Sequence, residues 1–265
     1  MTHRSLLSIA LRSATLLGTV SIAVVGCSDA ASDAATSASA AMTAKGSASA
    51  MTTSTPSATA TASAAAHPKM MEYGNPDAAK VGTLAPDTGI AVGQKVPDIQ
   101  VTDLDGKDVK LSELYAKQPI LLSFYRGGWC PFCNFEIHEM TKAFPEYQKL
   151  GVLPVAVSVD KPDQEAKMKA TYDIPFPVLS DSDAKMIEAF HVVNKLDDAG
   201  IEKMKGFGVD LESYSGKAHH EIAIPSFFLI DKTGTVRWAH SDPDFKVRPT
   251  TAQLLAAIEA AKLAK

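Results

Sequence analysis

The stretch SFYRGGWCPFCNFEIHEM, residues 123–140, holds two of the chain's three cysteines, Cys130 and Cys133, in the spacing C-x-x-C. It overlaps a short continuous apolar run, PILLSFY (119–125), which is typical of a strand buried on both faces. A helix is predicted from Pro131, because proline is favoured at the first helical position. The pair is therefore expected where a buried strand ends and a helix begins, with Cys130 at the N-cap.

A C-x-x-C pair can bind zinc, form an inert structural disulfide or do redox chemistry. Structural zinc needs four ligands, usually from a second Cys/His pair. The sequence has no second cysteine pair, and the adjacent His219 and His220 lack the usual ligand spacing. No metal site is expected, and an inert disulfide is the weaker alternative. Redox chemistry is favoured because a helix N-terminus stabilises a thiolate, the form of cysteine that attacks.

The segments around this stretch alternate between strands and helices. The hairpin expected over 96–114 turns at Asp105-Gly106, and Pro145 predicts a break in the helix that starts at Pro131. Strands are predicted at 152–160, 176–181, 224–231 and 235–240, with helices between them and at the C-terminus. These segments indicate one layered α/β domain over residues 85–265. The polar insert 196–220 has poor periodicity and is expected to be either a surface excursion or a lid.

The first 84 residues differ in composition from the rest of the chain. Basic residues precede an uncharged apolar run that ends in VVGC at Cys27, which is typical of a secretory signal over 1–26. VVGC resembles a bacterial lipobox, so Cys27 is the expected lipidation site of an exported, membrane-anchored lipoprotein. Residues 27–84 are rich in Ala, Ser and Thr and are expected to be a disordered linker. The formal net charge of −4 and the lack of a Lys/Arg block argue against nucleic-acid binding.

From about Gly93 to Gly234 the sequence resembles the peroxiredoxin-like AhpC/TSA superfamily of thioredoxin-fold proteins. The resemblance rests on SFYRGGWCPFC, VLPVAVSVD, FPVLSD and FFLIDKTG, which follow one another in the family's order. It implies a thioredoxin-like fold, in which helices flank a central mixed β-sheet and an N-terminal β-hairpin precedes it.

The resemblance is incomplete at the site. By register, Cys133 stands at the position of the family's peroxidatic cysteine, Cys130 at that of its threonine and Arg126 at that of its proline. The family's peroxide-binding arginine is replaced by Pro225, and an Ile-Pro pair there resembles thioredoxins. The buried acid of thioredoxins has no counterpart, because Phe124 occupies its register.

The leading hypothesis is a thiol peroxidase that reduces hydrogen peroxide or organic hydroperoxides through a Cys130/Cys133 dithiol–disulfide cycle. It needs no cofactor, only an external thiol reductant such as a thioredoxin-like protein. Register favours Cys133 as the attacking sulfur, whereas exposure at the helix cap favours Cys130.

The alternative is a membrane-tethered thiol-disulfide oxidoreductase acting on exported proteins, and a non-catalytic redox sensor is a minor alternative. Arg126 and Trp129 are expected to support the pair, and Pro225 to align a protein substrate. Glu136 is expected to be a solvated helix carboxylate.

Overall fold

The computed structural model describes residues 78–263. Its strands are β1 (Gln100–Thr102), β2 (Asp108–Lys110), β3 (Ile120–Phe124), β4 (Leu153–Ser158), β5 (Val178–Ser180), β6 (Val193–Lys195), β7 (Glu221–Ala223), β8 (Ser226–Ile230) and β9 (Val236–Ser241). Its helices are the 3-10 turn η1 (Ala78–Lys80), then α1 (Leu111–Tyr115), α2 (Pro131–Lys142), α3 (Phe144–Lys149), α4 (Pro162–Thr171), α5 (Lys185–Ala189), α6 (Asp198–Gly206), α7 (Leu211–Ser215) and α8 (Thr251–Ala261).

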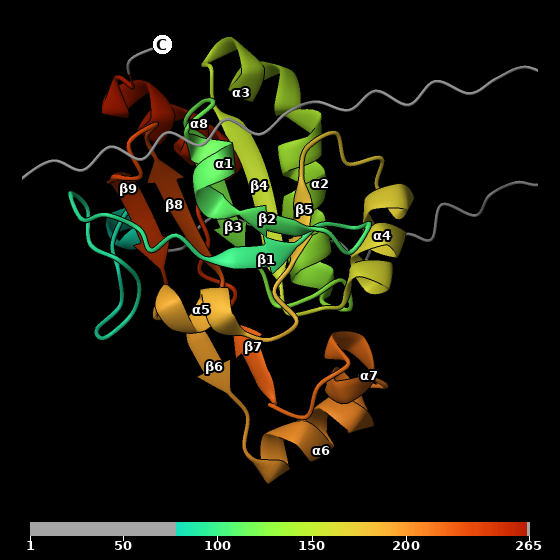
Figure 1. Ribbon diagram of the computed structural model, residues 1–265. Coiled ribbons are helices and arrows are strands. Elements are labelled where there is room, and N and C mark those ends of the chain that lie inside the picture. Colours follow the sequence, from blue (N-terminus) through green and yellow to red (C-terminus); the bar gives the residue numbers. More distant parts are fainter. Residues whose placement is uncertain (1–77, 264–265) are drawn as a thin grey trace, which may run out of the picture. The chain divides into compact units, whose positions relative to one another are not determined.

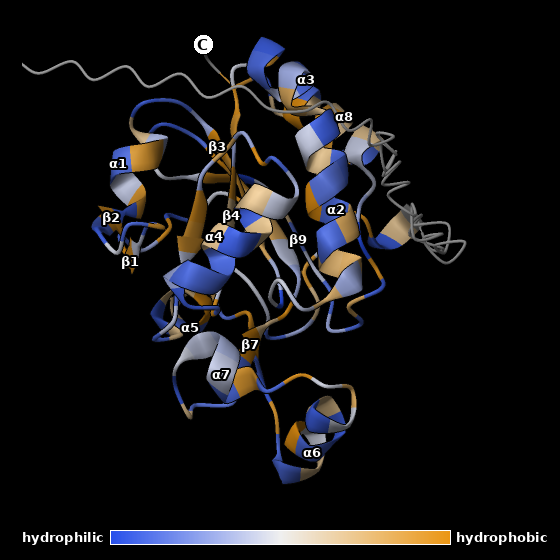
Figure 2. Cartoon of the chain, turned by 90° about the vertical axis from the view of Figure 1, so that its right-hand side faces the viewer, coloured by the Kyte–Doolittle hydropathy of each residue, from blue (hydrophilic) through white to orange (hydrophobic). Residues whose placement is uncertain are grey.

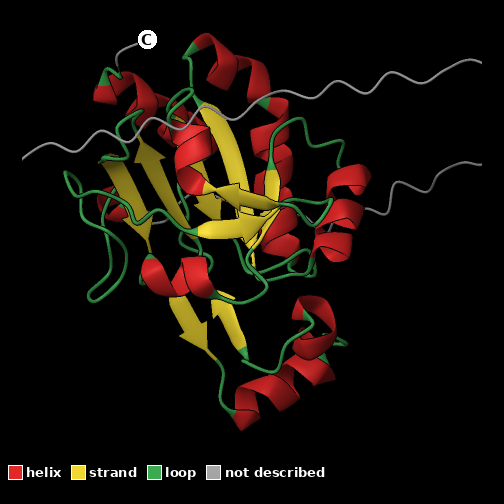
Figure 3. Ribbon diagram, viewed as in Figure 1, coloured by secondary structure: helices red, strands yellow, loops and turns green. Residues whose placement is uncertain are grey.

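Seven strands form one mixed sheet in the order β2-β1-β5-β4-β3-β8-β9 (Figures 1 and 3). The central strands β3, β4 and β5 are parallel, and β8 pairs antiparallel with β3. The hairpin β1–β2 joins the sheet through β5, and Gly106 in its turn has a φ of 77° that glycine adopts without strain. The predicted mixed sheet and N-terminal hairpin are confirmed.

Two hydrophobic cores cover the two faces of the sheet, and alternate residues of β3 supply them. Ile120, Leu122 and Phe124 enter the core that α1 and α5 cover. Leu121 and Tyr125 enter the core that α2, α3, α4 and α8 cover. This alternation follows from the period of two along a strand, and Figure 2 shows the apolar central strands between the helices. Both cysteines belong to the second core.

The long helix predicted after the cysteines is divided. α2 ends at Lys142 and α3 begins at Phe144, with Pro145 in its first turn. Contacts of the domain also begin before residue 85, its expected start, because Leu84 forms a parallel bridge with Ser241.

The insert 196–220 is helical. It forms α6 and α7, and the two-stranded ribbon β6–β7 connects it to the domain (Figure 1). Each helix has an aspartate N-cap: Asp197 accepts from the Gly200 N–H at 2.8 Å, and Asp210 accepts from the Ser213 N–H at 3.3 Å.

Candidate active site

The C-x-x-C pair lies at the junction of β3 and α2, as predicted. Cys130 is the N-cap of α2 with extended backbone (φ −91°, ψ 112°), and Pro131 starts the helix. Both thiols are free, and both residues are buried, with 1% of Cys130 and none of Cys133 exposed. The expectation that the cap position exposes Cys130 is wrong, because the second core closes over both sulfurs. Exposure therefore does not favour Cys130 as the attacking sulfur.

Cys133 is the sulfur that the site stabilises as a thiolate. The Arg126 backbone N–H donates to Cys133 Sγ at 3.4 Å, and Arg248 Nη2 donates at 3.3 Å. Burial alone raises the pKa of Cys133, but a hydrogen bond from Cys130, the charge of Arg248 and the Arg126 N–H lower that pKa to about 5. At neutral pH Cys133 is therefore ionised despite its burial.

Cys130 has the opposite character. Its hydrogen bond to Cys133 and its burial raise the pKa of the Cys130 thiol, and Arg126 Nη1, at 3.9 Å from Cys130 Sγ, only partly opposes this. The pair thus holds one thiolate and one neutral thiol. The neutral thiol is the proton donor of the pair.

Arg248 was not predicted from the sequence. It lies between β9 and α8, it is 4% exposed, and its Nε donates to the Phe245 carbonyl at 2.7 Å. Arg248 Nη1 also pairs with the carboxylate of Glu136, which is one helical turn beyond Cys133 on α2. The expectation of a solvated Glu136 is wrong: it is 8% exposed and holds the guanidinium beside the sulfur. Arg248 supplies the positive charge that Pro225 cannot.

The predicted supporting residue Arg126 lies between two aromatic rings. Its guanidinium carbon is 5.0 Å from the centroid of Trp129 and 4.4 Å from that of Phe245. These contacts place both Arg126 and Trp129 beside Cys130. The third predicted residue, Pro225, is buried directly before β8 and takes no part in the hydrogen bonds described around either sulfur.

A buried acid does lie next to the site, contrary to expectation. Asp160 follows β4, is 1% exposed and accepts from the Gly128 N–H at 2.7 Å. Burial raises the pKa of Asp160 to about 7, and the negative charge on Cys133 adds to this. Behind it, burial and the charge of Asp160 raise the pKa of Glu165, whose carboxylate accepts hydrogen bonds from Tyr125 and Ser158. The comparison with thioredoxins considered only the position of Phe124 in β3. It therefore missed Asp160, which follows the neighbouring strand β4.

A groove of about 640 Å³ opens beside Cys130. Arg126, Trp129 and Cys130 line one side of it, and residues of α6 and the turn after it line the other. The insert therefore forms a wall of the candidate site.

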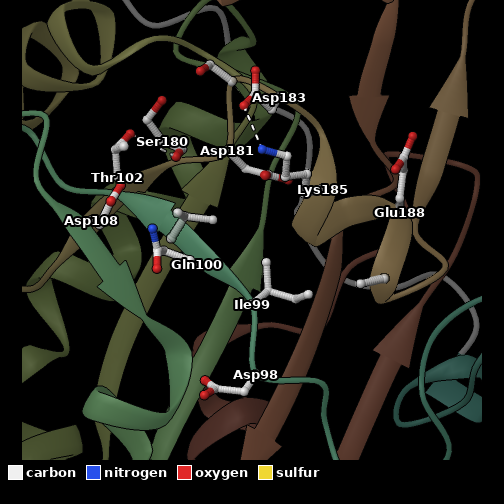
Figure 4. Close-up of a pocket in the computed structure, with 13 residues that line it drawn as sticks. Asp98, Ile99, Gln100, Thr102, Asp108, Ser180, Asp181, Asp183, Lys185 and Glu188 are labelled. Carbon is white, nitrogen blue, oxygen red and sulfur yellow. Dashed lines mark hydrogen bonds and ion pairs between the residues drawn. The ribbon is translucent and has the colours of Figure 1, made fainter.

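A second groove, of about 760 Å³, lies between β1 and α5, away from the cysteines (Figure 4). Two of its acidic residues, Asp181 and Asp183, have structural partners. Asp181 Oδ2 accepts from the Met186 and Ile187 N–H groups, each at 2.9 Å, at the start of α5. Asp183 pairs with Lys185 at 2.9 Å and with Lys217 at 2.8 Å. These partners account for Asp181 and Asp183 without a ligand.

Within residues 78–263, no group of His, Cys, Asp and Glu side chains is arranged to hold a metal ion. Across the same part of the chain, none of the helices has the length and apolar character needed to cross a membrane. Cys27 and the expected signal and linker up to residue 77 lie outside the described residues.

Comparison with solved structures places the fold. Peroxidoxin BcpB from Mycobacterium tuberculosis superposes with a TM-score of 0.51 at 21% identity, over 65% of this chain and 97% of that one. Reduced Prx3 from Vibrio vulnificus gives a TM-score of 0.53 at 18% identity, over 64% and 99%. Both support a thioredoxin-like peroxiredoxin fold.

Comparison with curated sequences gives two kinds of relative. Thiol-disulfide oxidoreductase ResA of Bacillus cereus (strain ATCC 10987 / NRS 248) is 30% identical over 156 residues, which cover 58% of this chain and 72% of the relative. Peroxiredoxin Bcp of Bacillus subtilis (strain 168) is 32% identical over 145 residues, which cover 55% and 81%. The AhpC/TSA family model matches residues 92–239, more than half of the chain and the whole of the C-x-x-C region. The chain therefore belongs to the AhpC/TSA family and is a thiol-dependent oxidoreductase.

Proposed function

We propose that this protein is a thiol peroxidase in which Cys133 attacks the peroxide and Cys130 resolves the product. The observation that carries the proposal is the pair of donors on one sulfur, the Arg126 N–H at 3.4 Å and Arg248 Nη2 at 3.3 Å from Cys133 Sγ. Two donors and a buried positive charge make Cys133 the thiolate of the pair. The thiolate is the nucleophile in peroxide reduction.

The chemistry follows from the two protonation states. The Cys133 thiolate attacks one peroxide oxygen, the O–O bond breaks, and the leaving oxygen takes a proton to become water or an alcohol. Cys133 becomes a sulfenic acid. The Cys130 thiol then condenses with it, which forms the S–S bond and releases water. An external thiol reductant returns the pair to the dithiol, and no cofactor is needed.

Burial favours peroxide over a protein disulfide as the oxidising substrate. No part of Cys133 is exposed, so a disulfide held in a folded protein cannot approach its sulfur in line. A peroxide of a few atoms needs far less space. The guanidinium of Arg248 is also placed to donate to an oxygen bound at Cys133.

Thiol-disulfide exchange is the second candidate. It is favoured by the 30% identity to a relative named thiol-disulfide oxidoreductase. In that reaction the sulfur that meets a protein disulfide is Cys130, the one that lines the groove beside α6. The two candidates therefore predict different nucleophiles.

Single-cysteine variants separate the candidates. Full-length protein carrying Cys27→Ser is compared with the same protein carrying Cys130→Ser or Cys133→Ser, after addition of one equivalent of hydrogen peroxide and a sulfenic-acid trap. Trapped sulfenic acid on Cys133 in the Cys130→Ser variant, and little in the Cys133→Ser variant, is the expected result. The reverse pattern, or none in either variant, would contradict the proposed peroxidase.

We further propose that Cys27 carries a lipid anchor and that the chain between Cys27 and residue 78 tethers the domain of an exported protein to a bacterial membrane. The support is the basic, apolar and VVGC order of the first 27 residues. Replacement Cys27→Ala should move the expressed protein from the membrane fraction to the soluble fraction. Retention in the membrane fraction would rule out lipidation at this residue.

A further inference from the structure

The groove beside Cys130 has an apolar wall that the insert supplies. Phe207, in the turn that follows α6, is 71% exposed, which is unusual for a phenylalanine. Figure 1 shows α6 and α7 set apart from the main sheet, and Figure 2 shows apolar residues on α6. The apolar side chains that line the groove include Phe132, Leu196, Met204, Phe207, Val209 and Phe245.

The charges of the groove have one sign. Its charged lining residues are Arg126 and Lys203, and none of the lining residues is an aspartate or a glutamate. Arg126 is held by two aromatic rings, whereas Lys203 is an exposed residue in the last turn of α6. An occupant that is apolar and carries a negative charge matches this lining.

The identity of the sulfur that lines the groove distinguishes two classes of occupant, a hydroperoxide and a thiol reductant. Cys130 lines the groove and Cys133 does not. A peroxide needs the thiolate of Cys133, so the groove is poorly placed for a long-chain hydroperoxide. Once the pair is oxidised, Cys130 is the disulfide sulfur that borders the groove. Because only 1% of Cys130 is exposed, a nucleophile must enter the groove on a short segment to contact it. Cys133 is then the better leaving group, because leaving ability increases as the thiol pKa falls.

We propose that this groove docks the reductant, as an apolar, acidic segment of a dithiol protein that presents its cysteine to Cys130. The reductant thiolate attacks Cys130 Sγ, a mixed disulfide forms, and the Cys130–Cys133 bond breaks with Cys133 leaving as the thiolate. The second reductant thiol then attacks the reductant sulfur of the mixed disulfide. This releases Cys130, which takes a proton, and leaves the reductant oxidised. The inference rests on the dithiol cycle of the proposed function and not on the identity of the oxidant.

The test uses full-length protein carrying Cys27→Ser, oxidised to the Cys130–Cys133 disulfide with a chemical oxidant. Two pentapeptides with a central cysteine act as reductants. One carries two phenylalanines, a leucine and an aspartate, and the matched peptide carries serines in place of the three apolar residues. Disulfide opening is followed by Trp129 fluorescence, and the adduct is located by alkylation and mass spectrometry.

The apolar peptide should react faster by on the order of tenfold, the equivalent of about 1.4 kcal/mol of binding, with the adduct on Cys130. Phe207→Ser should reduce this preference, whereas Lys203→Glu should slow both peptides, because both carry the aspartate. Val92→Ser is the matched control, because Val92 is another exposed hydrophobic residue, at 59%, and does not line the groove.

Equal rates for the two peptides, an adduct on Cys133, an unchanged preference in Phe207→Ser, or unchanged rates in Lys203→Glu would overturn the proposal. Preference for glutathione over the apolar peptide would identify a small-molecule thiol as the reductant and would also overturn it. Peroxide oxidation of the reduced protein, measured separately, should be the same in Phe207→Ser and Val92→Ser. Slow peroxide oxidation in every form would contradict the peroxidase and leave the docking result standing.

Discussion

Arg248 is predicted to set the ionisation of Cys133. A direct Arg248→Met replacement would leave Glu136 as an unpaired buried carboxylate, which costs about 3–5 kcal/mol. The informative comparison is therefore Glu136→Gln against Glu136→Gln/Arg248→Met. Both proteins lack the carboxylate, and they differ only in the guanidinium that contacts Cys133 Sγ at 3.3 Å.

The magnitude follows from that contact. A hydrogen bond to a charged group contributes about 1.5–3 kcal/mol, and about 1.4 kcal/mol corresponds to one pH unit in a titration. Loss of the guanidinium should move the titration of Cys133 upward by about 1–2 pH units. Well below the midpoint of the protein that keeps Arg248, the thiolate fraction should then fall by roughly tenfold or more.

The assay is the rate of iodoacetamide alkylation of the reduced protein as a function of pH, with Cys27→Ser and Cys130→Ser in both backgrounds. Removal of Cys130 also removes its hydrogen bond, so only the difference between the two backgrounds is interpreted. The midpoint should be higher in the protein without Arg248. Coincident midpoints in two folded proteins would refute the assignment of Arg248 as the thiolate-stabilising residue.

Two further predictions concern Asp160 and Gly127, which lie near the cysteine pair. The pKa of Asp160 is about 7 in the folded protein, against an ordinary value of 3.8. Between these two pH values, unfolding releases a proton from Asp160. The contribution of Asp160 to the free energy of unfolding therefore falls as pH rises from about 4 to 7. In urea unfolding, the free energy of unfolding of Asp160→Asn should therefore increase relative to that of the parent protein as pH rises through this range. A difference between the two proteins that does not change with pH would argue against a raised pKa of Asp160. Gly127 has a φ of 146°, and an added Cβ would meet Trp129 Nε1 and lie 2.8 Å from Asp160 Oδ1. Gly127→Ala should cost about 1–3 kcal/mol of unfolding free energy. Gly93→Ala should cost less, because a Cβ at Gly93 meets no atom within 4 Å. Equal costs would show that the contacts at Gly127 are unimportant.

The local features of the fold could be predicted because short stretches of sequence encode them. Asp105-Gly106 specifies the hairpin turn, and Pro131 fixes the first turn of the helix after Cys130. The order of strands and helices then limits the sheet to a few topologies. The insert was harder, because the caps Asp197 and Asp210 are recognisable but its helices, of nine and five residues, are short.

The decisive part of the site could not be predicted, because long-range contacts form it. Arg248 and Cys133 are 115 residues apart in the chain, and nothing near Arg248 marks it as a partner of a thiolate. Asp160 is hidden for the same reason, since it follows β4, a strand that adjoins β3 only in the folded sheet. Glu136 did carry a signal: it lies three residues after Cys133, so it shares the helix face that Cys133 buries.

The proposed peroxidase requires that the Cys133 thiolate reacts with peroxide. This reaction is measured by rapid mixing of reduced full-length protein, carrying Cys27→Ser, with hydrogen peroxide, and the two signals are Trp129 fluorescence and thiol loss. Oxidation should be orders of magnitude faster than that of a free cysteine, and this fast phase should be retained in Cys130→Ser and lost in Cys133→Ser. Oxidation no faster than free cysteine, or a fast phase that survives in Cys133→Ser, would contradict the proposed peroxidase.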